Sequence, residues 1–366
     1  MKNKVQELLN LAGIKINGTN PWDIQVHNEK FYARVLSGGI LALGESYMDG
    51  WWDCKELDVF FDKVISARLD KKVRMSFALT VLKSKVINLQ SKKTLKDSIH
   101  RHYDIGNELY TNMLDKNMQY TCGYWKNAKN LDQAQINKLK LICEKLHLKP
   151  GMSVLELGGG FGGLARFIAK EYKCTVVSYN ISKEQIKYGR EICKGLPVTF
   201  MEQDYREAKG TYDRVVSVGM CEHVGYKNYR SFMELIDRCL KDDGLCLVHT
   251  IGGNVSVHAN DEWTEKYTFP NSMLPSAKQL TVAYEGILVM EDWHNFSSDY
   301  DPTLMGWYNN FVKNWPKIKH LYDDRFYRMW SFYLLMCAGS FRSRKNQLWQ
   351  IVFSKNGVRG GYKSVR

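Results

Sequence analysis

The residues best suited to chemistry stand in a glycine-rich segment near the middle of the chain. An apolar run, Ser153–Leu157, leads directly into Gly158–Gly163, and a helical pattern follows over Leu164–Lys170. Glycines suit such a turn because the backbone must bend tightly and approach a ligand closely, which a Cβ would prevent. This order of strand, turn and helix predicts a binding loop for a small molecule.

Two kinds of ligand compete for this loop. Gly158, Gly160 and Gly163 satisfy the G-x-G-x-x-G pattern of dinucleotide sites, which is weak evidence on its own. A NAD site also needs Asp or Glu about 20 residues further on, where this chain has Asn180. The Glu-x-Gly-x-Gly-x-Gly spacing that begins at Glu156 is instead similar to the first motif of the Rossmann-like methyltransferases, whose loop holds the amino-acid part of S-adenosylmethionine. A glycine turn without a ligand remains an alternative.

Further candidates stand near the ends of predicted strands. Glu222 follows the apolar run that ends at Val218, and His249 ends the next such run. Sites in α/β sheets form at the carboxyl ends of strands, so we expect both side chains at the sheet opening. A core histidine with satisfied hydrogen bonds is the alternative for His249. Cys337 stands in an apolar helical stretch, Trp330–Phe341, which favours a structural role over a nucleophilic one.

From about residue 100, short β-like runs alternate with helical runs, and these elements must position the candidates. Strands that alternate with helices predict an α/β fold with a doubly wound parallel sheet. The tail from about residue 255 is rich in aromatic residues and mostly helical in pattern, so we expect it to pack over one edge of the sheet opening. The β-like runs are Ser153–Leu157, Thr175–Tyr179, Val198–Glu202, Arg214–Val218 and Leu245–Thr250.

The N-terminal part has a different pattern. It holds a short helical run around Val5 and Leu9, a strand-like run at Gly13–Gly18 and an aromatic cluster at Tyr47–Trp52. We therefore expect a smaller α+β domain at 1–70, a basic linker arm at 71–99 and the α/β domain at 100–366.

Charge and cysteine content narrow the class of protein. The net charge of +13 points to an anionic partner, either nucleic acid or a lipid surface. Residues 63–101 carry eleven Lys or Arg and two acids, and residues 341–366 carry seven basic residues and no acid. The nine cysteines show no C-x-x-C pair, and no apolar run has the length of a membrane span. We expect no disulfide or metal site, a cytoplasmic location and contact with a membrane only from its surface.

Motifs along nearly the whole chain resemble one family. They are His102–Asn107, Met118–Trp125, Val218–Gly225, His249–Gly252, Phe269–Asn271, Met290–His294 and Cys337–Phe341. In this order they are similar to the cyclopropane-fatty-acid and mycolic-acid synthases, which are S-adenosylmethionine-dependent methyltransferases. Leu43–Trp52 looks like the lipid-binding N-terminal domain of the bacterial phospholipid enzymes, which their mycolic-acid relatives generally lack. The resemblance implies a methyltransferase sheet of seven strands with a lipid-binding N-terminal domain.

The resemblance also assigns the cofactor S-adenosylmethionine to particular positions. Two of them depart from the family pattern: Gly159 is commonly Cys and Asn180 is usually Thr. The implied contacts are Tyr120, Thr121, Glu156, Gly158, Gly159, Gly160, Gly162, Asn180, Ile181, Gln185, Asp204 and Tyr205.

The chemistry that the resemblance implies is methylene transfer to a cis alkene. A methyl group adds to the double bond, a carbocation remains, and loss of a proton closes the ring in a pocket that excludes water. In the family a bound bicarbonate is the base that takes this proton. The matching positions are Cys122, Glu222, His249, the backbone of Ile251, and Tyr308; a nucleophilic Cys337 is the alternative.

The implied substrates are membrane phospholipids with unsaturated acyl chains. The implied setting is the inner, anionic face of the membrane, with the protein bound peripherally as a homodimer and without nucleic acid. A nucleic-acid methyltransferase would carry an Asn/Asp-Pro-Pro-Tyr motif or a cysteine nucleophile with a recognition domain, and we find neither. A non-catalytic lipid-binding scaffold would be expected to lose the glycines or Glu222. Family members that add a methyl or a hydroxyl-bearing branch remain alternatives.

Overall fold

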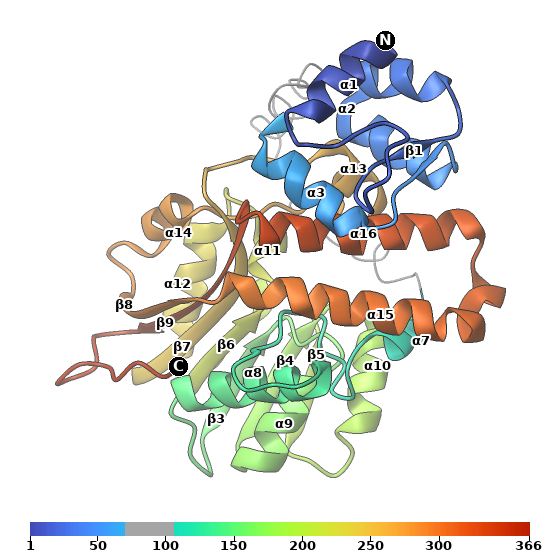
Figure 1. The fold of residues 1–366 in the computed structure, drawn as a ribbon. Coiled ribbons are helices and arrows are strands. Elements are labelled where there is room, and N and C mark those ends of the chain that lie inside the picture. Colours follow the sequence, from blue (N-terminus) through green and yellow to red (C-terminus); the bar gives the residue numbers. More distant parts are fainter. Residues whose placement is uncertain (70–105) are drawn as a thin grey trace.

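A computed structural model describes residues 1–69 and 106–366 (Figure 1). The predicted basic arm at 71–99, with both of its boundaries, lies outside the described residues. Within the described ranges, no helix combines the length and the apolar character that crossing a membrane requires.

A seven-stranded sheet forms the centre of the larger part, in the order β5-β4-β3-β6-β7-β9-β8. The neighbours from β5 to β7 are parallel, whereas β9 is antiparallel to both β7 and β8. This arrangement confirms the predicted α/β class and the strand number that the resemblance implied. The strands are β3 (Ser153–Leu157), β4 (Thr175–Asn180), β5 (Val198–Glu202), β6 (Tyr212–Val218), β7 (Leu240–Gly253), β8 (Val289–Asn295) and β9 (Asn346–Ser354).

Helices cover both faces of this sheet. On one face, α8 (Leu131–Lys145), α9 (Gly163–Tyr172) and α10 (Lys183–Ile192) bury Ile142, Ile168 and Ile186 against the strands. On the other, α12 (Tyr229–Cys239) and α14 (Ala277–Tyr284) bury Phe232 and Leu280. Short elements complete this part: α7 (Asn107–Met113), α11 (Cys221–Val224), α13 (Glu262–Tyr267), η1 (Tyr205–Glu207), η2 (Ser297–Asp299) and η3 (Lys319–Leu321).

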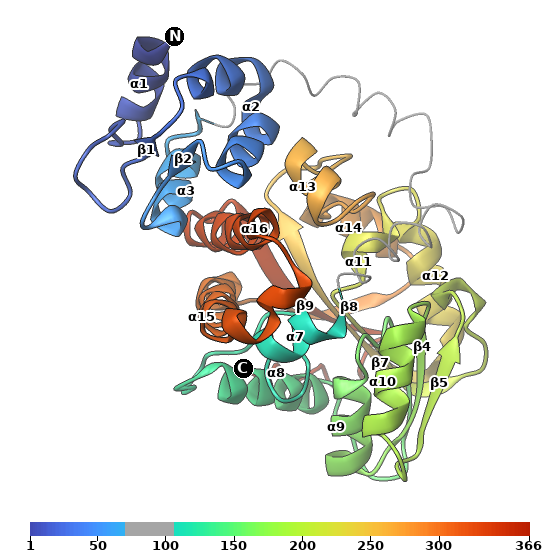
Figure 2. The ribbon, with the colours of Figure 1, turned by 90° about the vertical axis from the view of Figure 1, so that its right-hand side faces the viewer.

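Two long helices, α15 (Tyr300–Ile318) and α16 (Asp324–Arg342), lie beside the sheet opening. Figures 1 and 2 show α16 between the N-terminal helices and α15. The tail is thus mostly helical as predicted, but the sequence did not reveal β8 and β9. Most side chains of edge strand β8 are at least partly exposed, and Gln347 and Gln350 interrupt the apolar pattern of the buried strand β9.

The N-terminal part consists of α1 (Lys2–Asn10), α2 (Lys30–Met48), α3 (Leu57–Ser66) and the strand pair β1 (Gln25–Val26) and β2 (Trp52–Asp53). The predicted helix around Val5 and Leu9 is confirmed. The predicted strand at Gly13–Gly18 is wrong, because this segment forms only an isolated bridge at Ile16. The Asp23 carboxylate fixes it as a loop by accepting hydrogen bonds from the backbone of Lys15 and Asn20.

The last residue of the aromatic cluster Tyr47–Trp52 points into the protein interior. Trp52 is fully buried, and its ring contacts the rings of Phe31, Tyr47 and Phe60. Arg328 of α16 donates a hydrogen bond to the carbonyl of Trp52 at 2.8 Å. The N-terminal helices and α16 therefore share one core, and Trp52 is not available to a bilayer.

Close contact at Gly339 joins α16 to α3. A Cβ at this position would lie 2.6 Å from Phe61 Cβ and 2.7 Å from the Asp58 carbonyl oxygen. We predict that Gly339→Ala lowers the free energy of unfolding by about 1–3 kcal/mol, because overpacking outweighs the gain in helix propensity. Chemical denaturation followed by tryptophan fluorescence measures this change.

Gly306→Ala on α15 is the matched control. Its Cβ would meet Leu131 only at 3.5 Å, an ordinary contact. We expect this variant to be neutral or more stable by up to about 1 kcal/mol. Equal effects of the two substitutions would contradict a packing role for Gly339.

Candidate functional site

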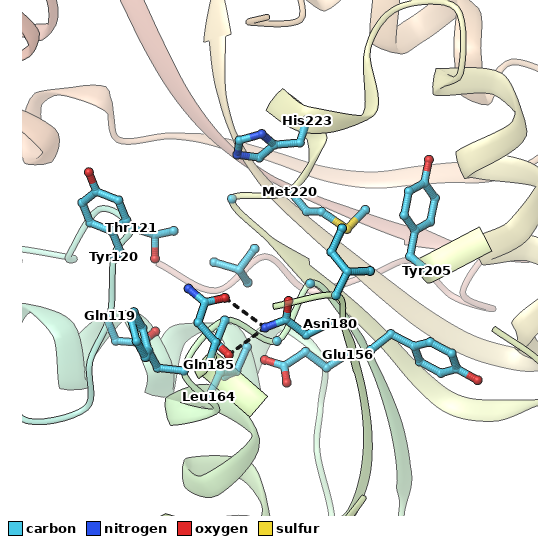
Figure 3. Close-up of a pocket in the computed structure, with 18 of the residues that line it drawn as sticks. Gln119, Tyr120, Thr121, Glu156, Leu164, Asn180, Gln185, Tyr205, Met220 and His223 are labelled. Carbon is cyan, nitrogen blue, oxygen red and sulfur yellow. Dashed lines mark hydrogen bonds between the residues drawn. The ribbon is translucent and has the colours of Figure 1, made fainter. Parts of the chain in front are cut away.

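A pocket opens at the carboxyl ends of β3, β4 and β6 (Figure 3). Every predicted cofactor residue except Gly162 lines it. The lining residues that the sequence did not predict as cofactor contacts are Met118, Gln119, Phe161, Leu164, Tyr179, Gln203, Val218, Gly219, Met220, His223 and Val224.

The glycine loop takes its shape from three close approaches. The N–H groups of Gly158 and Gly159 donate to the Tyr179 carbonyl at 3.0 and 3.1 Å, which fixes the loop to β4. A Cβ on Gly159 would collide with the Ser178 hydroxyl. Gly162 has a φ of +82° and would meet Phe200 at 2.8 Å, so it packs the loop against the protein interior rather than lining the pocket.

Polar side chains at the ends of β3 and β4 organise the pocket floor. Glu156 is buried, and burial raises the pKa of its carboxyl to about 7, although Ser178 donates to it at 2.6 Å. Asn180 donates to the Gly160 carbonyl and to Gln185 Oε1, both at 3.0 Å (Figure 3). Asn180 therefore ties the end of β4 to the glycine loop, at the position where a NAD site would have the Asp or Glu that binds the ribose.

The structure also shows a buried lysine next to the pocket that the sequence did not predict as a site residue. Lys138 of α8 donates hydrogen bonds to Gln119 Oε1 and, at 3.0 Å, to Thr121 Oγ1. Burial lowers the pKa of its ammonium to about 8. A signal was present, because Lys138 and Lys145 fall on the helix face that also carries Leu141 and Ile142. Two lysines on an apolar face indicate buried polar partners.

A second polar cluster lies next to this pocket, around the carboxyl end of β7. Glu222 and His249 are buried, and Glu222 Oε1 accepts the Ile251 N–H at 2.7 Å. Glu222 Oε2 and His249 Nε2 are buried without a hydrogen-bond partner. Burial raises the pKa of Glu222 to about 7 and lowers the pKa of His249 well below its usual value. Both groups can therefore be neutral at physiological pH.

Cys122 lies in the segment that joins the two clusters. Its thiol is buried and donates to the Gly123 carbonyl at 3.1 Å. The neighbouring residues Tyr120 and Thr121 line the cofactor pocket. One short segment thus serves both sites.

The structure brings Tyr300, and not Tyr308, to this second cluster. Burial is the largest cause of the raised pKa of Tyr300, and the next largest are the nearby groups of Cys122 and Glu222. Burial also raises the pKa of Tyr308, but the nearby groups that add to this rise are Tyr327 and Asp58. Eight residues of α15 separate the two tyrosines, roughly 12 Å along the helix axis. Both belong to one aromatic helix, so the sequence pattern did not distinguish them.

Cys337 lies on α16. Burial raises the pKa of its thiol to about 12, and Asp261 adds to the rise. A thiol that remains protonated is a poor nucleophile. Its surroundings are consistent with the structural role that the sequence favoured.

The strand order, the antiparallel β9 and the glycine-loop pocket together define a Rossmann-like methyltransferase of the S-adenosylmethionine-dependent class. Residues 90–351 match the family described as "Mycolic acid cyclopropane synthetase". The chain belongs to this family of cyclopropane synthases, which confirms the resemblance that its motifs indicated.

Individual relatives support the same placement. The chain is 52% identical to the cyclopropane-fatty-acyl-phospholipid synthase of Escherichia coli, over 98% of this chain and 94% of that one. It is 35% identical to a probable fatty acid methyltransferase of Pseudomonas putida, over 72% and 70%. The solved structure of mycolic acid cyclopropane synthase CmaA1 with SAH and CTAB has a TM-score of 0.67 at 26% identity, and covers 71% of this chain and 98% of its own.

Lys138 provides a test of how the pocket is held. We predict that Lys138→Met weakens S-adenosylmethionine binding about tenfold, because Gln119 and Thr121 lose their buried donor. Isothermal titration calorimetry measures the dissociation constant. Lys140→Met, on the exposed side of the same helix, should leave it unchanged. Normal binding by a folded Lys138→Met protein would contradict this role.

Proposed function

We propose that this protein transfers a methylene group from S-adenosylmethionine to the cis double bond of unsaturated acyl chains in phospholipids, forming a cyclopropane ring. The observation that carries the substrate class is the 52% identity to the E. coli phospholipid enzyme along nearly the full length of both chains. The two adjoining sites support the reaction type. One lies around the glycine loop, and the other is a buried polar cluster suited to proton transfer.

The surroundings of the second site suit a cationic reaction. S-adenosylmethionine supplies the methyl group, and its addition to an alkene leaves positive charge on the acyl chain. Aromatic rings line this region: Trp307 lies 5.2 Å from Tyr120 and 6.1 Å from Tyr300, between ring centroids. Their faces can stabilise a cation, and the burial of Trp307 and Tyr300 helps to exclude water that would trap it.

The buried cluster fits a small polar anion such as bicarbonate. Glu222 Oε2 and His249 Nε2 are both buried and unpartnered, which is costly unless a bound group satisfies them. When bound, bicarbonate supplies the base that the reaction requires. His249 would donate a hydrogen bond to it, and Glu222 would accept one from its O–H. The Ile251 N–H already bonds to Glu222, so it would act by orienting that carboxyl.

Cys122 and Tyr300 complete the proposed bicarbonate site, and Tyr300 takes the place that the sequence gave to Tyr308. Each lies close enough to the cluster to affect the ionisation of a neighbour. The remaining predicted cofactor contacts, from Tyr120 to Tyr205, belong to the S-adenosylmethionine pocket.

We also propose that the protein docks peripherally on the anionic, cytoplasmic face of a membrane, as a homodimer. The net charge of +13 and the seven basic residues without an acid in 341–366 support electrostatic docking. The basic arm would add to this attraction.

A product assay tests the proposed function. Pure protein, S-adenosylmethionine and vesicles of unsaturated phospholipid are incubated with and without bicarbonate. Mass spectrometry should then show the gain of one CH2 group with loss of the olefin. A methyl-branched or hydroxylated product, or no product, would exclude cyclopropane synthesis. Product formation that falls as salt rises would support electrostatic docking.

The carboxyl of Glu222 provides the first mutational test. We predict that Glu222→Ala lowers turnover by about 10²-fold or more, the size expected for a lost acid–base positioning group. The dissociation constant of S-adenosylmethionine should change little. Glu234→Ala, on the exposed face of α12, is the control and should remain active. Near-normal ring formation by Glu222→Ala would remove this residue from the site.

The two cysteines separate an anion site from a covalent route. We predict that Cys337→Ser retains substantial activity, because burial raises the pKa of its thiol to about 12 and so disfavours the nucleophilic thiolate. Cys122→Ser should lose more activity, and added bicarbonate should restore part of it. Steady-state rates at several bicarbonate concentrations measure both effects. Complete inactivation of a folded Cys337→Ser protein that binds the cofactor would favour the nucleophile instead.

A further inference from the structure

A row of polar side chains crosses the antiparallel side of the sheet and ends at the proposed bicarbonate site. Residues paired across neighbouring strands share one face of a sheet. Gln350 of β9 is paired with His249 of β7 on one side and with His294 of β8 on the other. Neither Gln350 nor His294 has a part in the chemistry described so far.

Gln350 makes the contact that matters for His249. Its amide Nε2 lies 3.2 Å from His249 Nδ1, and its side chain is fully buried. With the amide in this orientation its nitrogen faces Nδ1, and because an amide nitrogen can only donate, this orientation makes Nδ1 an acceptor without a proton. The proton of the neutral imidazole is then on Nε2, the atom that is buried without a protein partner.

Nearby charges keep this imidazole neutral. Burial is the largest cause of the lowered pKa of His249, and the ammonium groups of Lys138 and Lys145 lower it further. Lys145 is buried, donates to His294 Nδ1 at 3.0 Å and lies 3.7 Å from an oxygen of Asp292. A neutral histidine has one N–H, so the partner of Nδ1 decides where that N–H points.

We infer that Gln350 is a positioning residue, which holds His249 as the tautomer with its proton on Nε2 and so directs a hydrogen-bond donor at the bound anion. The inference rests on the proposed function for the identity of the anion. The tautomer itself is a property of the free protein. If Gln350 accepted from Nδ1–H instead, His249 would present a lone pair to the anion and repel it.

The tautomer can be observed directly by NMR of the protein labelled with ¹⁵N-histidine. The His249 signals are identified by their loss in His249→Asn. In the native protein we expect Nε2 to carry the proton and Nδ1 to be unprotonated. Gln350→Leu should give a mixture of tautomers, and Gln350→Glu should move the proton to Nδ1, because a carboxylate can only accept.

Gln347→Leu is the matched control. Gln347 is a second buried glutamine of β9, and its side chain bonds to Asn295 and Ser297 rather than to His249. This variant should keep the Nε2–H tautomer. A native His249 with its proton on Nδ1, or an unchanged tautomer in Gln350→Leu, would overturn the inference.

Kinetics give a second readout that simple destabilisation would not reproduce. We expect Gln350→Leu to raise the bicarbonate concentration for half-maximal rate about tenfold, with unchanged S-adenosylmethionine binding. Gln350→Glu should regain activity as pH falls at constant bicarbonate concentration, because protonation of His249 restores the Nε2–H group. If both variants lose activity and the loss depends on neither pH nor bicarbonate concentration, Gln350 has only a structural role.

The proposed function and the role of Gln350 can be refuted separately. A native protein that forms no cyclopropane product, or that ignores bicarbonate, would refute the proposed function, while the NMR measurement would still decide the role of Gln350. A native protein that forms the product but holds His249 with its proton on Nδ1 would refute the inference alone.

Discussion

The donation from Lys138 to Gln119 and Thr121 is the interaction on which both sites depend. The short segment around these residues gives Tyr120 and Thr121 to the cofactor pocket and Cys122 to the second cluster. From the other side, Thr303 of α15 accepts hydrogen bonds from the Gly123 N–H at 3.1 Å and from the Trp125 indole at 2.9 Å. The segment is thus fixed between α8 and α15. In the proposed reaction a methyl donor and a base act on one acyl chain and must be held at a constant separation, which these contacts would provide.

Much of the site could be read from the sequence because its chemistry follows the strand pattern. The five parallel strands have short apolar runs with helices between them, so Glu222, His249 and the glycine loop could be placed at the same edge. Features set by tertiary contacts could not be read in this way. Strand β9 is central but contains Gln347 and Gln350, whose hydrogen-bond partners Ser297 and His249 come next to them only when the chain is folded. The same holds for Tyr300 and Tyr308, because their depth along α15 depends on where that helix begins.

The N-terminal helices are part of the same packed body as the aromatic tail. Their core continues through Trp52, Phe61 and Phe332 into α16, and charged groups reinforce the contact. Arg342 of α16, for example, forms ion pairs with Asp58 of α3 and Asp301 of α15, each at 2.8 Å. The CmaA1 structure is covered almost entirely by 71% of this chain, so this chain has additional structure beyond the fold that the two share. Here the N-terminal part covers the side of α16 that would otherwise expose aromatic residues.

The two buried lysines of α8 also constrain the order in which this chain can fold. An ammonium group is costly to bury until its partners are in place. Lys138 finds its partners in a neighbouring loop, but Lys145 bonds to His294, which lies 149 residues further along the chain. Without β8, a docked α8 would bury Lys145 without its partners His294 and Asp292. Stable packing of α8, and with it the support that Lys138 gives to the binding pocket, is therefore expected to depend on a strand at the far edge of the sheet.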